Sequence, residues 1–165
     1  MLIERGGKFA LRVWDAESPS RKHFTGIDRY PVSASWKIEA RWEPYKIPKN
    51  VQVPTVISGL MQDGIVPGAA VFVLNGKEYR LEPTIEEGET EYFFVFGDKT
   101  NGKETYGAGR FLYAGPPVNG MITLDFNKAY NPPCAFSGFA TCHVPFKQNR
   151  LPVRIEAGEK NYKGH

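Results

Sequence analysis

The stretch Ala69–Leu81 (AAVFVLNGKEYRL) decides the fold, because it has the pattern of two short strands joined by a tight turn. Asn75-Gly76 supplies the two residues that most readily adopt the positive φ angles of a type I′ turn. We therefore expect an antiparallel hairpin in which Phe72 pairs with Tyr79.

The segment Ser35–Trp42 has the next clearest strand pattern. Its apolar residues alternate with charged ones, so Trp36, Ile38, Ala40 and Trp42 share one face, which we expect to cover a core. Further strands are expected over residues 9–14 (with one face inward), 51–57, 91–96, 110–113, 121–126 and 152–157, with a short helix or turn within 15–24, a turn region over 58–67, a hairpin loop over 114–120 and a frayed tail over 158–165.

These strands follow one another through short connections, and no long helix interrupts them. The pattern predicts a single all-β domain over residues 1–165 with minor short helices. Either an antiparallel β-barrel or a two-sheet sandwich built of hairpins fits it. Residues 127–151 have little strand pattern but several aromatic residues, and we expect a long C-terminal loop packed on the sheet.

The composition excludes several classes of protein. The 165 residues carry a net charge of +3 from scattered Lys and Arg, without the basic patch typical of nucleic-acid-binding proteins. No apolar run approaches the roughly 20 residues of a membrane span, and residues 1–12 lack the pattern of a signal peptide. We therefore expect a soluble cytoplasmic protein that binds neither nucleic acid nor a membrane.

Polar residues cluster where the strand at 121–126 meets the long loop. Asp125 is the acidic residue of that strand, and Asn127 and Asn131 follow it. A carboxylate on an interior face needs a partner, because an isolated buried charge is strongly disfavoured. Arg110 on the preceding strand is the expected partner, and its planar guanidinium would also suit a carboxylate or phosphate of a ligand.

These residues define a candidate site under the loop at 127–151. A ligand anchored there would have Asp125 or His143 to move a proton. The predicted catalytic residues are Asp125, His143 and Tyr130, and the predicted ligand-binding residues are Arg110, Asn127, Asn131, Tyr106 and Asn149. No Gly-x-Ser-x-Gly, His-Glu-x-x-His or Walker sequence indicates a common hydrolase or nucleotidase.

The two cysteines, Cys134 and Cys142, lie in the same loop. In a reducing cytoplasm we prefer two partly buried thiols, and a disulfide that clamps the loop is the next alternative. A metal held by Cys134, Cys142 and His143 is the weakest alternative, because the Cys-x-x-Cys spacing of structural zinc sites is missing. A structural or redox role is therefore predicted for the cysteines, and no metal or other cofactor is assigned.

Two other sequence patterns are interpreted as structural features with no catalytic or binding role. The run Tyr106–Arg110 (YGAGR) continues as a strand and not as a helix, so its glycines indicate a bulge or a close backbone approach instead of a phosphate-binding loop. The acidic stretch Glu82–Glu91 is expected to be a solvated loop and not a metal site.

Several segments together carry a family resemblance. They are DAESP at 15–19, DKTNGKETY at 98–106, GAGRFL at 107–112, LDFNKAYNPPCAF at 124–136 and NRLPV at 149–153. These segments closely resemble the bacterial and archaeal family called domain of unknown function 1684. The resemblance covers nearly the whole chain and implies a shared fold, but the family has no established activity. Ala108 stands where the family usually has a glycine, and members often carry upstream strands that a shortened form would lack.

Two functions remain open at this point. The first is binding or transformation of a small anionic or polar ligand in a pocket under the loop at 127–151, and the sequence does not decide whether that makes an enzyme. The second is a structural or interaction module, in which the network of Arg110, Asp125 and Asn127 only braces the loop. Exposed aromatic side chains would then contact a partner or a second copy in a homodimer.

Overall fold

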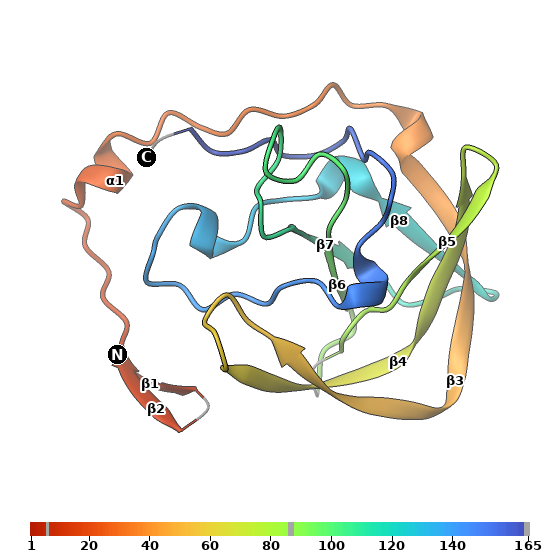
Figure 1. Ribbon diagram of the computed structural model, residues 1–165, viewed down its shortest axis with the longest axis horizontal. Helices are drawn as coiled ribbons and strands as arrows, with labels where there is room; N and C mark the ends of the chain where they lie inside the picture. The colour runs from red at the N-terminus through yellow and green to blue at the C-terminus, as the bar shows by residue number, and fades with distance from the viewer. Residues whose placement is uncertain (6, 86–87, 164–165) are drawn as a thin grey trace.

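In the computed structural model, described over residues 1–5, 7–85 and 88–163, antiparallel strands make up most of the regular structure (Figure 1). The strands are β1 (Leu2–Arg5), β2 (Lys8–Leu11), β3 (Lys37–Pro54), β4 (Met61–Leu74), β5 (Lys77–Leu81), β6 (Tyr92–Phe96), β7 (Arg110–Ala114) and β8 (Met121–Asp125). The helical segments are α1 (Pro19–Lys22) and the 3₁₀ turns η1 (Ala34–Trp36), η2 (Phe126–Lys128), η3 (Pro133–Ala135) and η4 (Lys147–Asn149). The all-β class with minor short helices is confirmed. In this described part, no helix has the length and apolarity needed to cross a membrane.

The hairpin at the centre of the chain forms as expected. β4 and β5 pair in antiparallel orientation, with Phe72 opposite Tyr79. The turn residues Asn75 and Gly76 have φ angles of 52° and 74°. These values are those of a type I′ turn, whose twist matches the twist of the flanking strands.

β3 and β4 are longer than the sequence pattern indicates. β3 is one strand where two were expected, and a register shift between Pro44 and Lys49 accommodates its prolines as a β-bulge. The turn region expected over 58–67 is present only at its start, because a turn occurs at 58–59 and β4 already begins at Met61. Pairing with residues 50–54 of β3 holds this part of β4 extended in spite of its glycines and proline.

Two sheets make up the barrel-like body. The larger sheet has the strand order β5-β4-β3-β8, and β6 pairs with β7 in the smaller sheet. Isolated antiparallel bridges connect the two sheets, because Ile85 pairs with Ile65 of β4 and Thr84 pairs with Phe93 of β6. The larger sheet curls like half a barrel around the smaller one (Figure 1).

The hydrophobic core fills the space between the two sheets. Phe94, Phe96 and Leu112 of the smaller sheet are fully buried there, as are Ala40 and Leu124 of the larger sheet. The expected inner face of the segment at 35–42 is confirmed, since its tryptophans and isoleucine pack against this cluster. Burial of each large apolar side chain contributes about 1.5–3 kcal/mol of stability.

Three expectations about the edges of the sheets are wrong. β7 and β8 do not pair with each other, because the connection between them crosses from the smaller sheet to the larger one. Residues 152–157 form no strand, although Ile155 is fully buried. The C-terminal segment is not frayed at its start, because Glu159 forms a backbone bridge with Arg29.

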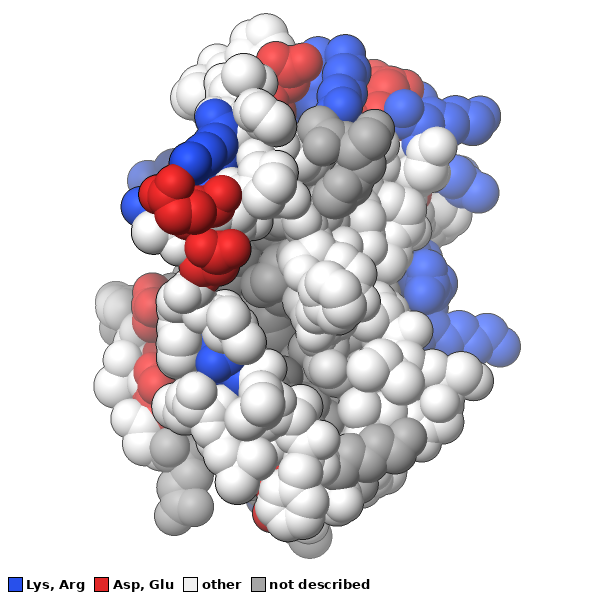
Figure 2. All heavy atoms as spheres, turned by 90° about the vertical axis from the view of Figure 1, so that its left-hand side faces the viewer, with Lys and Arg blue, Asp and Glu red and all other residues white. Residues whose placement is uncertain are grey.

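The N-terminal hairpin of β1 and β2 lies apart from the barrel (Figure 1). The strand expected near residues 9–14 is present as β2, but its expected inward face is wrong, because Phe9, Leu11 and Val13 are 73%, 73% and 77% exposed. Figure 2 looks at this side of the molecule, where many of the charged side chains gather towards the top.

Candidate functional site

The long loop at 127–151 packs on the outer face of the β6–β7 sheet. Tyr130 forms a backbone bridge with Phe111 of β7, and the two rings meet edge to face with centroids 5.7 Å apart. Val95 and Phe111 are buried together with Cys142 in a small second apolar cluster. The loop is therefore an ordered cover, and the expectation that it packs on the sheet is confirmed.

Arg110 is fully buried, and both of its Nη atoms donate to acceptors of the protein, whereas its Nε has no hydrogen-bond partner among the described residues. Its Nη2 lies 2.8 Å from Asp98 Oδ2 and 2.9 Å from the carbonyl oxygen of Ile155, and its Nη1 donates to the carbonyl of Ala157. Burial lowers the pKa of Arg110, and the charge of Asp98 opposes that effect. The expected pair of Arg110 with Asp125 is therefore wrong, because the partner is Asp98.

Asp125 and Asn127 form a local cap at the end of β8. Asp125 Oδ1 accepts hydrogen bonds from the backbone nitrogen of Asn127 at 3.2 Å and from its Nδ2 at 2.9 Å. Asn127 also exchanges two hydrogen bonds with the backbone of Ser33. The two residues do lie together, as expected, but they fasten η2 to the chain before η1 and do not meet Arg110.

Asn131 and Asn149 use their side chains on backbone groups. Asn149 Nδ2 donates to the carbonyls of Glu82 at 2.8 Å and Val95 at 3.0 Å, and its Oδ1 accepts from the backbone nitrogen of Glu82 at 2.9 Å. Asn131 Nδ2 donates to the carbonyl of Lys160 at 2.8 Å. Both side chains therefore hold the loop to neighbouring segments, as asparagines in irregular structure often do.

Tyr106 and Tyr130 have partly buried phenol groups. Tyr106 Oη donates to the carbonyl of Cys134 at 3.2 Å, and Tyr130 stacks on Tyr113 with ring planes 13° apart. Burial raises the pKa of both phenols, with further increases from Cys134 for Tyr106 and from Tyr113 for Tyr130. Each phenol therefore stays protonated at neutral pH and can donate a hydrogen bond, but it is a poor general base.

The two cysteines are neighbours in space. The backbone nitrogen of Cys134 donates to Cys142 Sγ at 3.1 Å, and no disulfide joins the two cysteines. Within the described ranges, no three His, Cys, Asp or Glu side chains are grouped as a metal site requires. The weak alternative of a metal at Cys134, Cys142 and His143 gains no support, and a redox role for the thiols stays a prediction.

His143 lies in a groove at the far end of the β3–β4 hairpin. The groove has a volume of about 640 Å³ and is lined by Asn50, Val51, Gln52, Val53, Asp63, Gly64, Ile65, Thr84, Ile85 and His143. His143 Nε2 lies 2.5 Å from Gln62 Oε1. A Cβ at Gly64 would come within 2.7 Å of Val53 Cγ2, so glycine at this position leaves room for the Val53 side chain. We call this feature the His143 groove.

The predicted site residues are thus distributed over separate places and do not form one constellation. Arg110 lies in the core, Asp125 and Asn127 at the end of β8, and Tyr130 on the outer face of the smaller sheet. Of the predicted catalytic residues, His143 is the one that lines the groove.

Glu82 is a buried carboxylate that the sequence analysis missed. It is 5% exposed, although the stretch at 82–91 was expected to be solvated. It accepts hydrogen bonds from Tyr45 Oη, from Lys49 Nζ at 3.0 Å and from Gln148 Nε2 at 2.7 Å. Burial acts to raise the pKa of Glu82, but the three donors outweigh it and the pKa is lowered.

The local sequence pattern did not indicate this cluster. Glu82 directly follows Leu81, the buried last residue of β5, and alternation along a strand would place Glu82 on the opposite face. Glu89 and Glu91 are exposed, as expected for a solvated loop, whereas Glu86 and Glu87 lie outside the described residues.

Comparison with known proteins agrees with the fold. The family model described as "Protein of unknown function (DUF1684)" matches residues 22–160. The solution NMR structure of an uncharacterized protein from Haloarcula marismortui is similar, with a TM-score of 0.73 and 28% sequence identity over 90% of this chain and 83% of that chain. No curated protein matches the sequence.

Proposed function

Because this chain belongs to the DUF1684 family of proteins of unknown function, its site must be judged from geometry, and we propose that it binds a small polar molecule in the His143 groove. The observation that carries the proposal is the volume of the groove, about 640 Å³. This volume is within the roughly 300–1,000 Å³ typical of small-molecule sites.

The lining of the groove has the mixed character of a ligand site. Such sites combine an apolar surface with a few polar groups that orient the ligand. The apolar part comes from Val51, Val53, Ile65 and Ile85, and the polar part from Asn50, Gln52, Asp63, Thr84 and His143. Thr84 exchanges two backbone hydrogen bonds of 2.9 Å with Phe93, so this wall of the groove is held by the sheet.

The ligand is expected to be neutral or positively charged. Among the described residues that line the groove, Asp63 is the only Asp, Glu, Lys or Arg. The sequence-based expectation of an anion depended on Arg110, whose guanidinium is buried among protein acceptors. A polar molecule with an amine or amide group fits the lining better, because a carboxylate would face Asp63.

A titration followed by ¹H–¹⁵N NMR tests the proposal. Probes are ethanolamine, acetamide and acetate, each added up to millimolar concentration. We expect ethanolamine and acetamide to shift the backbone signals of Gly64, Thr84 and His143, and acetate to shift them less. If none of the three probes shifts these signals, the proposal is overturned.

Variants separate binding in the groove from general effects. Asp63→Asn keeps the shape of the side chain but removes its charge, so ethanolamine should bind several-fold more weakly while acetamide is unaffected. Asp15→Asn, a change in the exposed N-terminal segment, is the matched control. Equal weakening by Asp15→Asn and Asp63→Asn would count against the groove as the site.

A second candidate function is a structural module in which the candidate residues only brace the loop. It is supported by Arg110, Asn127 and Asn149, which donate hydrogen bonds to Asp98 and to the backbone carbonyls of Ser33 and Glu82, respectively. The same titration separates the two candidates, because a module of this kind has no reason to bind the probes at the groove.

A further inference from the structure

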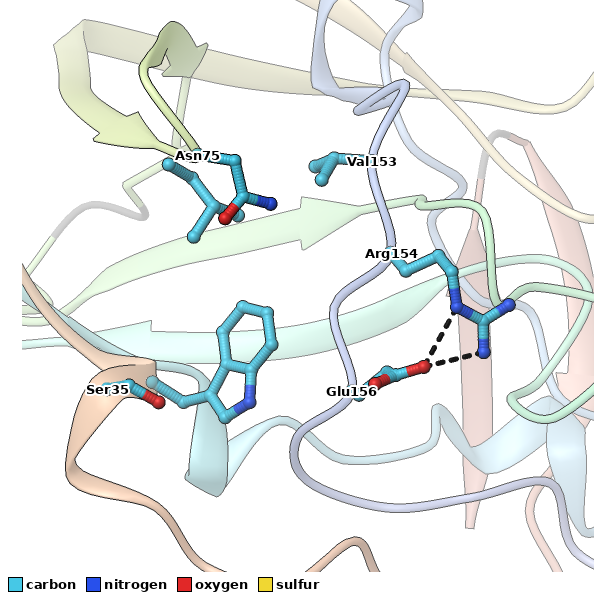
Figure 3. Close-up of a pocket in the computed structure, with 7 residues that line it drawn as sticks. Ser35, Asn75, Val153, Arg154 and Glu156 are labelled. Carbon is cyan, nitrogen blue, oxygen red and sulfur yellow. Dashed lines mark hydrogen bonds and ion pairs between the residues drawn. The ribbon is translucent and has the colours of Figure 1, made fainter.

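A second recess lies between the turn of the β4–β5 hairpin, η1 and the C-terminal segment (Figure 3). It has a volume of about 440 Å³ and is lined by Ser35, Trp36, Leu74, Asn75, Val153, Arg154 and Glu156. In Figure 3, Asn75 and Val153 border one side of the recess, and Ser35 and Glu156 lie opposite them. None of these residues lines the His143 groove. We call this feature the Trp36 recess.

Trp36 gives the recess an aromatic wall. Its indole ring meets the ring of buried Phe126 edge to face, with centroids 6.4 Å apart and planes at 79°, and this contact fixes the ring. Trp36 remains partly exposed to solvent. Its indole N–H has no hydrogen-bond partner among the described residues. A ligand in the recess would therefore meet both an apolar ring and an unused donor.

Asn75 and Arg154 add further unused polar groups. The side-chain amide of Asn75 has no hydrogen-bond partner within the described ranges, and the type I′ turn fixes the backbone of this residue. Arg154 Nε lies 2.8 Å from Glu156 Oε1, and Arg154 Nη2 lies 2.7 Å from both carboxylate oxygens of Glu104. These bonds hold the guanidinium in place and leave Nη1 available as a donor.

We propose that the Trp36 recess binds a neutral cyclic polyol, which is a ring that carries several hydroxyl groups, as a monosaccharide does. A hydroxyl group donates one hydrogen bond and accepts others, so it suits a site that offers both kinds of group. Asn75 offers both, Trp36 and Arg154 offer donors, and Glu156 offers acceptors. The C–H face of the ring packs against the indole, where apolar contact is favourable.

The charges around the recess favour a neutral ligand over an ion. Arg154 lies between the carboxylates of Glu104 and Glu156. An anion near Arg154 would be repelled by both carboxylates, and a cation near Glu156 would be repelled by the fixed guanidinium. A neutral polyol avoids both repulsions and still forms hydrogen bonds to charged groups, which are stronger than those between neutral groups.

An NMR titration that observes the indole N–H signals tests this proposal. The chain has three tryptophans, and Trp36→Phe identifies the signal of Trp36. Probes are methyl α-D-glucopyranoside and myo-inositol as cyclic polyols, glycerol as an acyclic polyol, and tetramethylammonium as a cation. We expect a cyclic polyol to shift the Trp36 signal with a dissociation constant of roughly millimolar order, while the Trp14 and Trp42 signals do not move.

Two turn variants provide a matched pair. Asn75→Gly removes the amide but keeps a residue that tolerates positive φ, so we expect about fivefold weaker binding from the loss of one side-chain contact. Asn119→Gly is the same substitution at a second Asn-Gly pair in which both residues have positive φ, 51° and 76°, and it should leave binding unchanged. Equal effects of the two variants would overturn the proposal.

Two further results of the titration would overturn the proposal for the Trp36 recess. Absence of any Trp36 shift with both cyclic polyols overturns the proposal, and so does a larger shift with tetramethylammonium than with the polyols. This inference does not depend on the function proposed for the His143 groove, because the groove is observed through Gly64 and Thr84 and the recess through Trp36. Either proposal can fail while the other stands.

Discussion

Asp98 and Arg110 form an ion pair of 2.8 Å in which both side chains are fully excluded from solvent. Asp98 Oδ1 also accepts hydrogen bonds from the nitrogen of Thr100 at 2.7 Å and from its Oγ1 at 2.6 Å. The guanidinium in turn donates to the carbonyls of Ile155 and Ala157. The C-terminal segment, which has no strand of its own, is therefore held in place by a buried side chain.

Replacement of Arg110 by Met should destabilise the fold by about 3–5 kcal/mol, because it leaves Asp98 buried without its partner. Asp98→Asn should also destabilise, since the neutral amide no longer balances the buried guanidinium. The double variant should lose less than the sum of the two, because the residues share one interaction. Urea denaturation of the four proteins measures this. Additive losses would mean that the pair is not coupled.

The ionisation of Glu82 should make the stability of the fold depend on pH. Its pKa is lowered in the folded protein, so its contribution to stability is present above the unfolded pKa of about 4.3 and is lost as pH falls through the folded value. Glu82→Gln should lower stability at pH 7 by about 1–3 kcal/mol and should make stability less sensitive to acid. Denaturation measured from about pH 7 to pH 3 tests this, with exposed Glu89→Gln as the control. A parallel pH profile for Glu82→Gln and the wild type would contradict the prediction.

The strand content was predictable from the sequence because it depends on local pattern. The Asn75-Gly76 turn and the alternation at 35–42 each specify a geometry within a few residues, and both are confirmed. The bulge between Pro44 and Lys49 was not predictable in the same way. Prolines usually end strands, and the long pairing partner that overrides them is distant in sequence.

The candidate site was less predictable, because its contacts are long-range. Asp125 was the expected partner of Arg110 because β7 and β8 were expected to be neighbours, but β8 pairs with β3 and Arg110 pairs with Asp98. Glu82 looked like the first residue of a solvated acidic run, yet Tyr45 and Gln148 approach it from distant parts of the chain. The charge pattern of a segment does not indicate which distant residues pack against it.

Removal of residues 1–14 should change the free energy of unfolding by less than about 1 kcal/mol. The hairpin closes on itself through hydrogen bonds between Met1 and Arg12, and its apolar side chains are exposed. Removal of residues 1–29 is the informative contrast, because Phe24 packs on Tyr162 at 5.6 Å and Arg29 pairs with Glu159 at 3.1 Å. Thermal unfolding should show a lower midpoint for the longer deletion. A large loss with the shorter deletion would show that the hairpin does stabilise the barrel.

The two glycines that flank Ala108 should respond oppositely to substitution by alanine. Gly109 has a φ of 107°, and a Cβ there would lie 2.7 Å from the carbonyl oxygen of Phe96 and 2.7 Å from Pro145 Cγ. Gly109→Ala should therefore cost about 2 kcal/mol or more, from backbone strain and from displacement of its neighbours.

Gly107→Ala is the matched control for this prediction. A Cβ at Gly107 would meet its nearest neighbour at 3.7 Å, which is ordinary van der Waals contact. Alanine also restricts the unfolded chain, so this variant should be neutral or slightly more stable, by up to about 1 kcal/mol. Urea denaturation of both variants decides the matter. Similar losses in both would mean that the run YGAGR needs its glycines for flexibility, whereas a loss confined to Gly109 identifies one close backbone approach, where β7 begins beside β6, as the reason for glycine.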